Sequence, residues 1–143
     1  MTKVLVDSNI LIYSVDIREG QKYLQASKEI LKLVERDELV VSTQNLAELS
    51  SVLLEKTDPP QNPDNVMNYI FRLHKLGSII GYDHETVIRA ISISKQSGIH
   101  FFDALLAATM QENGVSEILT EDTADFKKIK WLTARNPLKG KGD

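Results

Sequence analysis

Short runs of aliphatic residues alternate along this chain with longer stretches that have the period of a helix. The runs are rich in β-branched residues and have the length of a strand, which is typical of buried strands. The predicted strands cover residues 3–6, 39–41, 78–82 and 116–119, with a further short strand near Trp131 and Leu132.

The stretches between the strands predict helices. In residues 23–35, apolar side chains recur every three or four positions, and lysines and glutamates occupy the other faces. Pro59 and Pro60 stop one helix, and Asn62 followed by Pro63 starts the next. The predicted helices cover residues 9–14, 23–35, 43–56, 63–76, 85–96 and 101–113. Because strands alternate with helices, we predict a three-layer α/β/α sandwich with a central, mainly parallel sheet.

The composition is that of one ordinary globular domain. The 143 residues are 42% hydrophobic and 26% charged, and no repeat or linker divides them. We predict one domain over residues 1–133, followed by a basic tail over residues 134–143. The chain has no cysteine, which excludes disulfide bonds, a thiolate zinc site and a cysteine nucleophile. It shows no signal-peptide pattern and no apolar run of membrane-spanning length, so we expect a cytoplasmic protein without a membrane partner.

The charge is unevenly distributed. A net charge of −3 argues against a protein that binds nucleic acid by charge alone. The end of the chain is nevertheless basic, and a solvated tail and an RNA contact are both compatible with this. Its basic residues, opposed by the single acid Asp143, are Lys127, Lys128, Lys130, Arg135, Lys139 and Lys141.

Four acidic residues occupy helix starts or strand ends. Asp7 follows the first strand, Asp122 follows the fourth, and Glu48 and Asp103 lie in the first turns of predicted helices. Taken singly, each has an ordinary use as a helix cap, a residue favoured by the helix dipole or a solvent-exposed acid. In a parallel sheet, however, the carboxyl ends of the strands share one edge, so the four carboxylates can converge there.

Converging carboxylates repel one another and require a cation. Oxygen ligands alone favour Mg²⁺ or Mn²⁺, since the three histidines His74, His84 and His100 show no spacing typical of metal ligands. A cation held by carboxylates can activate water in phosphodiester hydrolysis. It also makes the local electrostatic potential positive, which allows an anionic substrate to bind. The pattern thus favours a metal-dependent nuclease.

The motifs around these acids resemble the PIN-domain nucleases, and among them the single-domain VapC-type toxins of toxin–antitoxin pairs. The resemblance spans nearly the whole chain and rests on four blocks in this order and spacing: VLVDSNILIY at residues 4–13, NLAEL at 45–49, FDALLAAT at 102–109 and LTEDTADF at 119–126.

The resemblance implies roles for individual residues. It makes Asp7, Glu48 and Asp103 the central metal-binding and catalytic acids, with Asp122 as the best match to the fourth. Asp125 is the other candidate in the same block. The remaining supporting positions, which orient an acid or bind water in the family, are Ser8, Asn9 and Thr120; Asn9 is also a possible helix cap.

The resemblance further implies an Mg²⁺- or Mn²⁺-dependent endoribonuclease that cleaves an RNA substrate. For the VapC type it implies a homodimer inhibited by an antitoxin protein from a neighbouring gene. PIN domains also act in RNA processing and decay without an antitoxin, so toxin is a narrower expectation than nuclease.

Other functions fit an α/β fold with acids at the sheet edge. A receiver-like signalling domain would use Asp83 as its phosphoryl acceptor, but receivers carry paired acids after the first strand, where this chain has Asp7 alone. A haloacid-dehalogenase-like phosphatase would need Asp-x-Asp where this chain has Asp7-Ser8-Asn9. A PIN-like binding module without catalysis is the third alternative.

Overall fold

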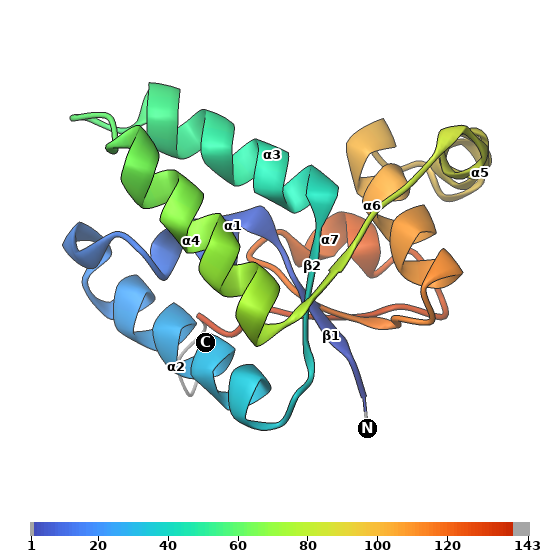
Figure 1. Cartoon of the computed structure of the whole chain (residues 1–143). Coiled ribbons are helices and arrows are strands. Elements are labelled where there is room, and N and C mark those ends of the chain that lie inside the picture. Colours follow the sequence, from blue (N-terminus) through green and yellow to red (C-terminus); the bar gives the residue numbers. More distant parts are fainter. Residues whose placement is uncertain (1, 139–143) are drawn as a thin grey trace.

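The computed structural model describes residues 2–138, and in this part of the chain five strands form one parallel sheet (Figure 1). The strand order is β3-β2-β1-β4-β5, so the first strand lies at the centre. The strands are β1 (Val4–Val6), β2 (Leu39–Ser42), β3 (Ser78–Ile80), β4 (Glu117–Leu119) and β5 (Thr133–Arg135).

Helices connect the strands and cover both faces of the sheet (Figure 1). Those on the β1–β3 half of the chain are α1 (Ser8–Tyr13), a 3-10 turn η1 (Ile17–Glu19), α2 (Gln21–Glu35), α3 (Thr43–Ser51), its π-helical continuation η2 (Val52–Lys56) and α4 (Pro63–Leu76). After β3 come α5 (His84–Ser97), α6 (Phe101–Glu112) and α7 (Thr123–Phe126).

The sheet divides two hydrophobic cores, as alternating side chains of each strand point to opposite faces. Leu5, Val40 and Ile118 pack with α5, α6 and α7. Their strand neighbours Val4 and Val41 pack instead with α1 to α4. The prediction of a three-layer sandwich with a parallel sheet is therefore confirmed.

Local sequence signals explain where α4 begins and ends. The Asn62 side chain accepts a hydrogen bond from the Asp64 N–H, and Pro63 occupies the first turn, as predicted. Gly77 ends the helix, and a Cβ at this position would lie 2.8 Å from the carbonyl oxygen of Leu39. Glycine thus allows the close approach of this turn to β2.

The structure differs from the sequence prediction mainly at element ends. The last strand lies at Thr133–Arg135, two residues beyond its expected place, so the sheet extends into the segment predicted as a tail. Arg135 belongs to β5 and forms an ion pair with Glu29, whereas Lys139 and Lys141 lie outside the described residues. Within residues 2–138, no helix is both long enough and apolar enough to span a membrane.

Candidate functional site

Asp7 lies at the centre of the carboxyl edge of the sheet, directly after β1, and is 9% exposed. Its Oδ1 accepts hydrogen bonds from the Ser8 N–H at 2.7 Å and the Asn45 Nδ2 at 3.1 Å. Its Oδ2 accepts one from the Thr120 hydroxyl at 2.8 Å. Burial raises the pKa of Asp7 and outweighs the hydrogen bonds from Thr120 and Ser8, which lower it. Three neutral donors thus fix the carboxylate without neutralising its charge.

Asn45 connects Asp7 to the start of α3. The Ser42 hydroxyl accepts from the Asn45 N–H at 3.0 Å and the Asn45 Oδ1 accepts from the Ser42 N–H at 3.3 Å, which closes a capping box. The Ser42 hydroxyl also donates to the Asn45 Oδ1 at 2.7 Å. These bonds leave the Asn45 amide nitrogen directed at Asp7. Sequence reasoning assigned Asn45 no role, although Ser42 three residues before an amide is a recognisable cap pattern.

Glu48 approaches Asp7 from the exposed side of α3. The Ser8 hydroxyl lies 3.4 Å from both the Asp7 Oδ1 and the Glu48 Oε1, so it bridges the two carboxylates. Partial burial raises the pKa of Glu48, and the negative charge of Asp7 raises it further. The structure thus brings Glu48 to the same edge as Asp7.

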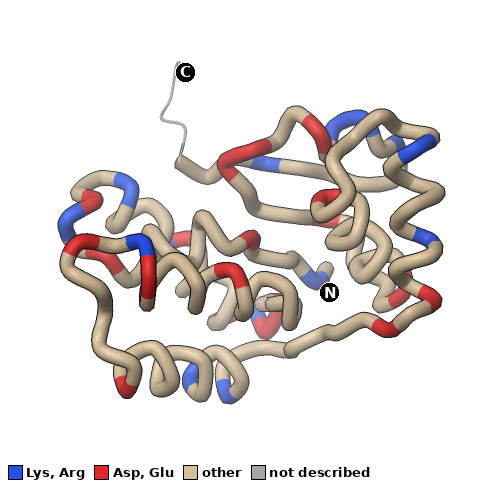
Figure 2. The backbone as a smooth tube through the Cα atoms, turned by 90° about the horizontal axis from the view of Figure 1, so that it is seen from above, with Lys and Arg blue, Asp and Glu red and all other residues tan. Residues whose placement is uncertain are grey.

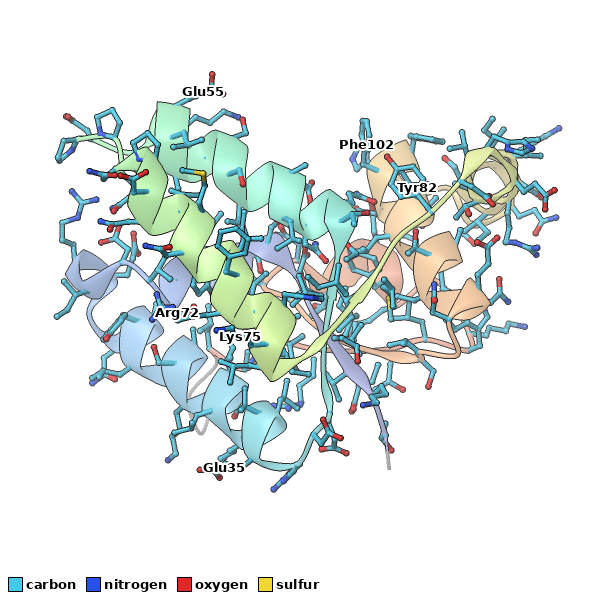
Figure 3. All side chains as sticks on the ribbon, viewed as in Figure 1. Glu35, Glu55, Arg72, Lys75, Tyr82 and Phe102 are labelled. Carbon is cyan, nitrogen blue, oxygen red and sulfur yellow. The ribbon has the colours of Figure 1, made fainter. Side chains whose placement is uncertain are left out.

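Asp103 lies half-buried in the first turn of α6, while the preceding Phe102 points into solvent with 63% of its area exposed (Figure 3). Burial, followed by a hydrogen bond and charge repulsion from Asp125, raises the pKa of Asp103 to about 7. The Asp125 Oδ2 accepts the His100 N–H at 3.2 Å, which lowers the pKa of Asp125. The pair thus holds a proton on Asp103 near neutral pH.

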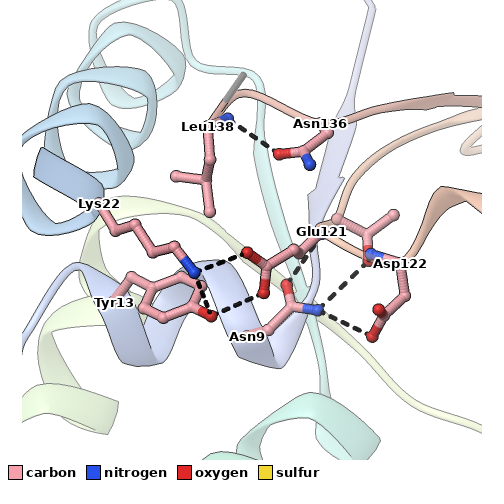
Figure 4. Close-up of polar contacts among 8 residues, drawn as sticks. Asn9, Tyr13, Lys22, Glu121, Asp122, Asn136 and Leu138 are labelled. Atoms are coloured by element: carbon pink, nitrogen blue, oxygen red, sulfur yellow. Dashed lines mark hydrogen bonds and ion pairs between the residues drawn. The ribbon is translucent and has the colours of Figure 1, made fainter. Parts of the chain in front are cut away.

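Asp122 stands before α7 without capping it, because no hydrogen bond joins its side chain to this helix. Its Oδ2 lies 3.5 Å from the Asn9 Nδ2, which also lies 3.5 Å from the Thr120 hydroxyl (Figure 4). The Thr120 hydroxyl in turn accepts the Asp122 N–H at 3.1 Å. Asn9 and Thr120 therefore link Asp122 to Asp7.

The four predicted acids share one negative region. The charge of Asp122 raises the pKa of Asp7, and the charge of Asp7 raises those of Glu48 and Asp103. In the described part of the chain, none of the four forms an ion pair. A pocket opens here, lined by His100, Asp103, Glu121, Asp122, Thr123, Ala124 and Asp125.

This donor set fits a divalent cation that prefers oxygen ligands. The carboxylates are held by neutral donors or face solvent, and their mutual repulsion would be relieved by a cation. Among residues 2–138, no three acids or histidines are already grouped closely enough to coordinate an ion. The residues therefore fit the metal in chemistry, and the coordination geometry is not preformed.

Two further residues lie at the site, although the sequence analysis gave them no role there. His100 lines the pocket, and its charge acts to lower the pKa of Asp103. Its position directly before the helix that carries Asp103 was the available signal. Glu121 lines the same pocket from the turn between Thr120 and Asp122.

Asp83 was the acceptor in the receiver-like alternative, and the structure gives it a structural use. Its Oδ1 accepts hydrogen bonds from the Glu85 and Thr86 N–H groups and from the Thr86 hydroxyl, so it caps α5. These bonds lower the pKa of Asp83. It does not line the pocket that contains Asp103 and Asp122.

Several solved structures have a similar fold. A FitAB complex bound to an IR36 DNA fragment matches with a TM-score of 0.72 and 20% identity, over 96% of this chain and 97% of that one. VapBC2 of Rickettsia felis, bound to a promoter DNA fragment, matches with a TM-score of 0.68 and 17% identity, over 94% and 98%. The sarcin–ricin loop cleaving toxin VapC20 of Mycobacterium tuberculosis matches with a TM-score of 0.62 and 14% identity, over 87% and 94%.

At these identities the structural matches show the fold alone, and no curated protein matches the chain. The family follows from the sequence model of the PIN domain, which matches residues 4–132 and so covers all four acids. The chain therefore belongs to the PIN domain family.

Proposed function

We propose that this protein is an endoribonuclease that depends on Mg²⁺ or Mn²⁺ and hydrolyses RNA phosphodiester bonds. The observation that carries the proposal is the convergence of Asp7, Glu48, Asp103 and Asp122 at one sheet edge without a cationic partner among the described residues. Basic positions are scattered among acidic ones along the chain (Figure 2), which does not favour RNA binding by charge alone.

Each acid has a distinct part in this proposal. Asp7 is fixed by Ser8, Asn45 and Thr120 and so provides an oriented carboxylate. The Asp103 and Asp125 pair holds a proton that metal binding would displace, because a ligating carboxylate must be ionised. Glu48 and Asp122 would complete the set. A bound divalent cation would activate water for attack on the phosphate and stabilise the leaving oxygen.

The test is cleavage of a structured RNA in the presence of Mg²⁺, Mn²⁺ or EDTA. Asp7→Asn keeps the shape of the side chain and removes its charge, and should abolish metal-dependent cleavage. Asp64→Asn is the matched control, because Asp64 is an exposed acid in the first turn of α4. Equal cleavage by both variants would refute the proposal and leave a PIN-like binding module as the better description.

We further propose that the protein is the toxin of a toxin–antitoxin pair and acts as a homodimer. The support is the fold shared with the FitAB and VapBC complexes. Co-expression with the product of a neighbouring gene should yield a stable complex that no longer cleaves RNA, and light scattering of the isolated protein should give twice the mass of the chain. If the complex cleaves RNA as fast as the isolated protein, the product of the neighbouring gene is not an antitoxin.

A further inference from the structure

Glu121 is an acid of the pocket edge that is bound differently from the four proposed ligands. Its carboxylate points toward α1 and α2 (Figure 4). The Tyr13 hydroxyl donates to the Glu121 Oε1 at 2.6 Å, and the Lys22 Nζ donates to its Oε2 at 3.0 Å. The Lys22 Nζ also lies 3.3 Å from the Tyr13 hydroxyl oxygen and 4.8 Å from the centre of its ring. Both carboxylate oxygens of Glu121 are thus engaged by side chains from two helices.

In this network, the positive charge of Lys22 balances the negative charge of Glu121. Burial acts to raise the pKa of Glu121, but the hydrogen bonds of Tyr13 and Lys22 and the positive charge of Lys22 outweigh it and lower the pKa. The carboxylate of Glu121 is therefore paired with a cation, whereas among the described residues no cation pairs with Asp7 or Asp103. The two oxygens of Glu121 are also already occupied, which disfavours it as a metal ligand.

Glu121 is the middle residue of the turn from Thr120 to Asp122, and both of its neighbours belong to the candidate site. The Glu121 side chain makes the shortest contacts between this turn and the helices α1 and α2. On one side is Thr120, which donates to Asp7, and on the other is Asp122. Asn9 also contacts the turn, but through longer contacts of 3.3 Å to the Glu121 N–H and 3.5 Å to Thr120 and Asp122. The bonds of 2.6 and 3.0 Å made by the Glu121 side chain therefore restrain the position of the turn better than the contacts of Asn9 do.

We propose that Tyr13 and Lys22 are positioning residues that hold the turn from Thr120 to Asp122 through Glu121, which is not itself a ligand of the metal. This inference rests on the proposed function, since the turn carries Asp122. Lys22 and Glu121 are partly exposed, and an ion pair of this kind alone contributes little. The Tyr13 hydroxyl bond is therefore the principal contact, and its removal is the sharpest test.

The first measurement needs no metal. Hydrogen exchange of the metal-free protein reports whether the Glu121 and Asp122 amides are held, and Tyr13→Phe should accelerate exchange at both. Tyr82→Phe is the matched control, because it removes one hydroxyl from a tyrosine that is 45% exposed and lies after β3. Unchanged exchange at Glu121 and Asp122 in Tyr13→Phe would overturn the inference, whether or not the protein binds metal.

The second measurement is the Mn²⁺ concentration that gives half of the metal-induced rise in melting temperature. Tyr13→Phe should raise it about tenfold, as expected for groups that orient a ligand. Lys22→Met should raise it less, and Lys28→Met, an exposed lysine of the same helix, should leave it unchanged. The double variant of Tyr13→Phe with Lys22→Met should match Glu121→Ala, because all three remove one network.

Glu121→Gln separates a positioning role from a direct one. Glutamine can still accept from Lys22 through its oxygen and donate to the Tyr13 oxygen through its amide, so it should bind Mn²⁺ better than Glu121→Ala. If Glu121→Gln is as defective as Glu121→Ala while Tyr13→Phe is normal, Glu121 is a ligand and the inference is wrong. Asp7→Asn must abolish the Mn²⁺ effect; if it does not, the proposed function has failed, and the exchange measurement still decides the role of Tyr13.

Discussion

The hydroxyl of Thr120 offers a direct test of how the site is held together. Thr120 is fully buried, and its hydroxyl donates to the Asp7 carboxylate at 2.8 Å while accepting the Asp122 N–H. Thr120→Val keeps the shape of the side chain and removes both bonds, together with the 3.5 Å contact from the Asn9 Nδ2. A hydrogen bond to a charged group contributes about 1.5–3 kcal/mol. With a smaller loss at the Asp122 N–H, which the nearby pocket can hydrate, we expect a destabilisation of about 2–3 kcal/mol.

This destabilisation is measurable by thermal or urea unfolding in EDTA. The unfolding entropy is about 2.1 cal/mol/K per residue of the chain, so this destabilisation corresponds to a fall in melting temperature of roughly 7–10 °C. The penalty depends on an ionised Asp7, so it should shrink as the pH falls through the raised pKa of this group. The Mn²⁺-induced stabilisation should also weaken, because Asp7 loses a bond that orients it.

Thr109→Val is the matched control. Thr109 is also fully buried, but its hydroxyl donates at 2.8 Å to the Leu105 carbonyl within α6, a local bond with little net effect on helix stability. We expect a change below about 1 kcal/mol. Equal losses in Thr109→Val and Thr120→Val at neutral pH would show that the Asp7 contact contributes nothing specific, and would refute the reasoning.

Three other predictions concern charge and packing. In EDTA, the free energy of unfolding should fall as the pH rises from about 4 to 7, because unfolded Asp titrates near 3.9 and folded Asp103 near 7. Asp103→Asn should reduce this slope in urea titrations. The raised pKa values of Asp7 and Glu48 also contribute to the slope, and the lowered pKa of Asp125 opposes it. Asp7→Asn should melt higher than the wild type without metal and lose the Mn²⁺ response. Gly77→Ala should lose about 1–3 kcal/mol in urea unfolding, since its Cβ meets Leu39.

The sequence predicted the sheet and its edge well because both follow from local patterns. Aliphatic runs mark β1, β2 and β4, and the parallel topology then places Asp7 and Asp122 at the same end of the sheet. The last strand was placed two residues early because Thr133–Arg135 contains no hydrophobic run and is stabilised by pairing with β4 at the sheet edge.

The sequence could not predict which side chains meet across the site. The choice between Asp122 and Asp125 remained open, and in the structure each has its own partner: Asn9 for Asp122 and Asp103 for Asp125. Such contacts join residues far apart in the chain and depend on the conformation of loops. Loop conformation produces no periodic pattern in the sequence from which the contacts could be predicted. The link between Tyr13 and Glu121 spans 108 positions and is of the same kind.

The pKa shifts of five acids differ in sign according to their partners. Asp16 and Glu121 have Arg18 and Lys22 as partners and lowered pKa values, whereas Asp7, Glu48 and Asp103 have raised ones.

Folding alone does not explain the charge at Asp7. An asparagine there would keep the bonds from Ser8 and Asn45, and the Thr120 hydroxyl could rotate to accept from its amide. That exchange would remove a buried charge that repels Glu48 and Asp103. The carboxylate therefore costs stability in the metal-free protein, and binding of a cation, as proposed above, would offset this cost. The same cation would reverse the local sign and let an acidic protein accept the phosphates of RNA.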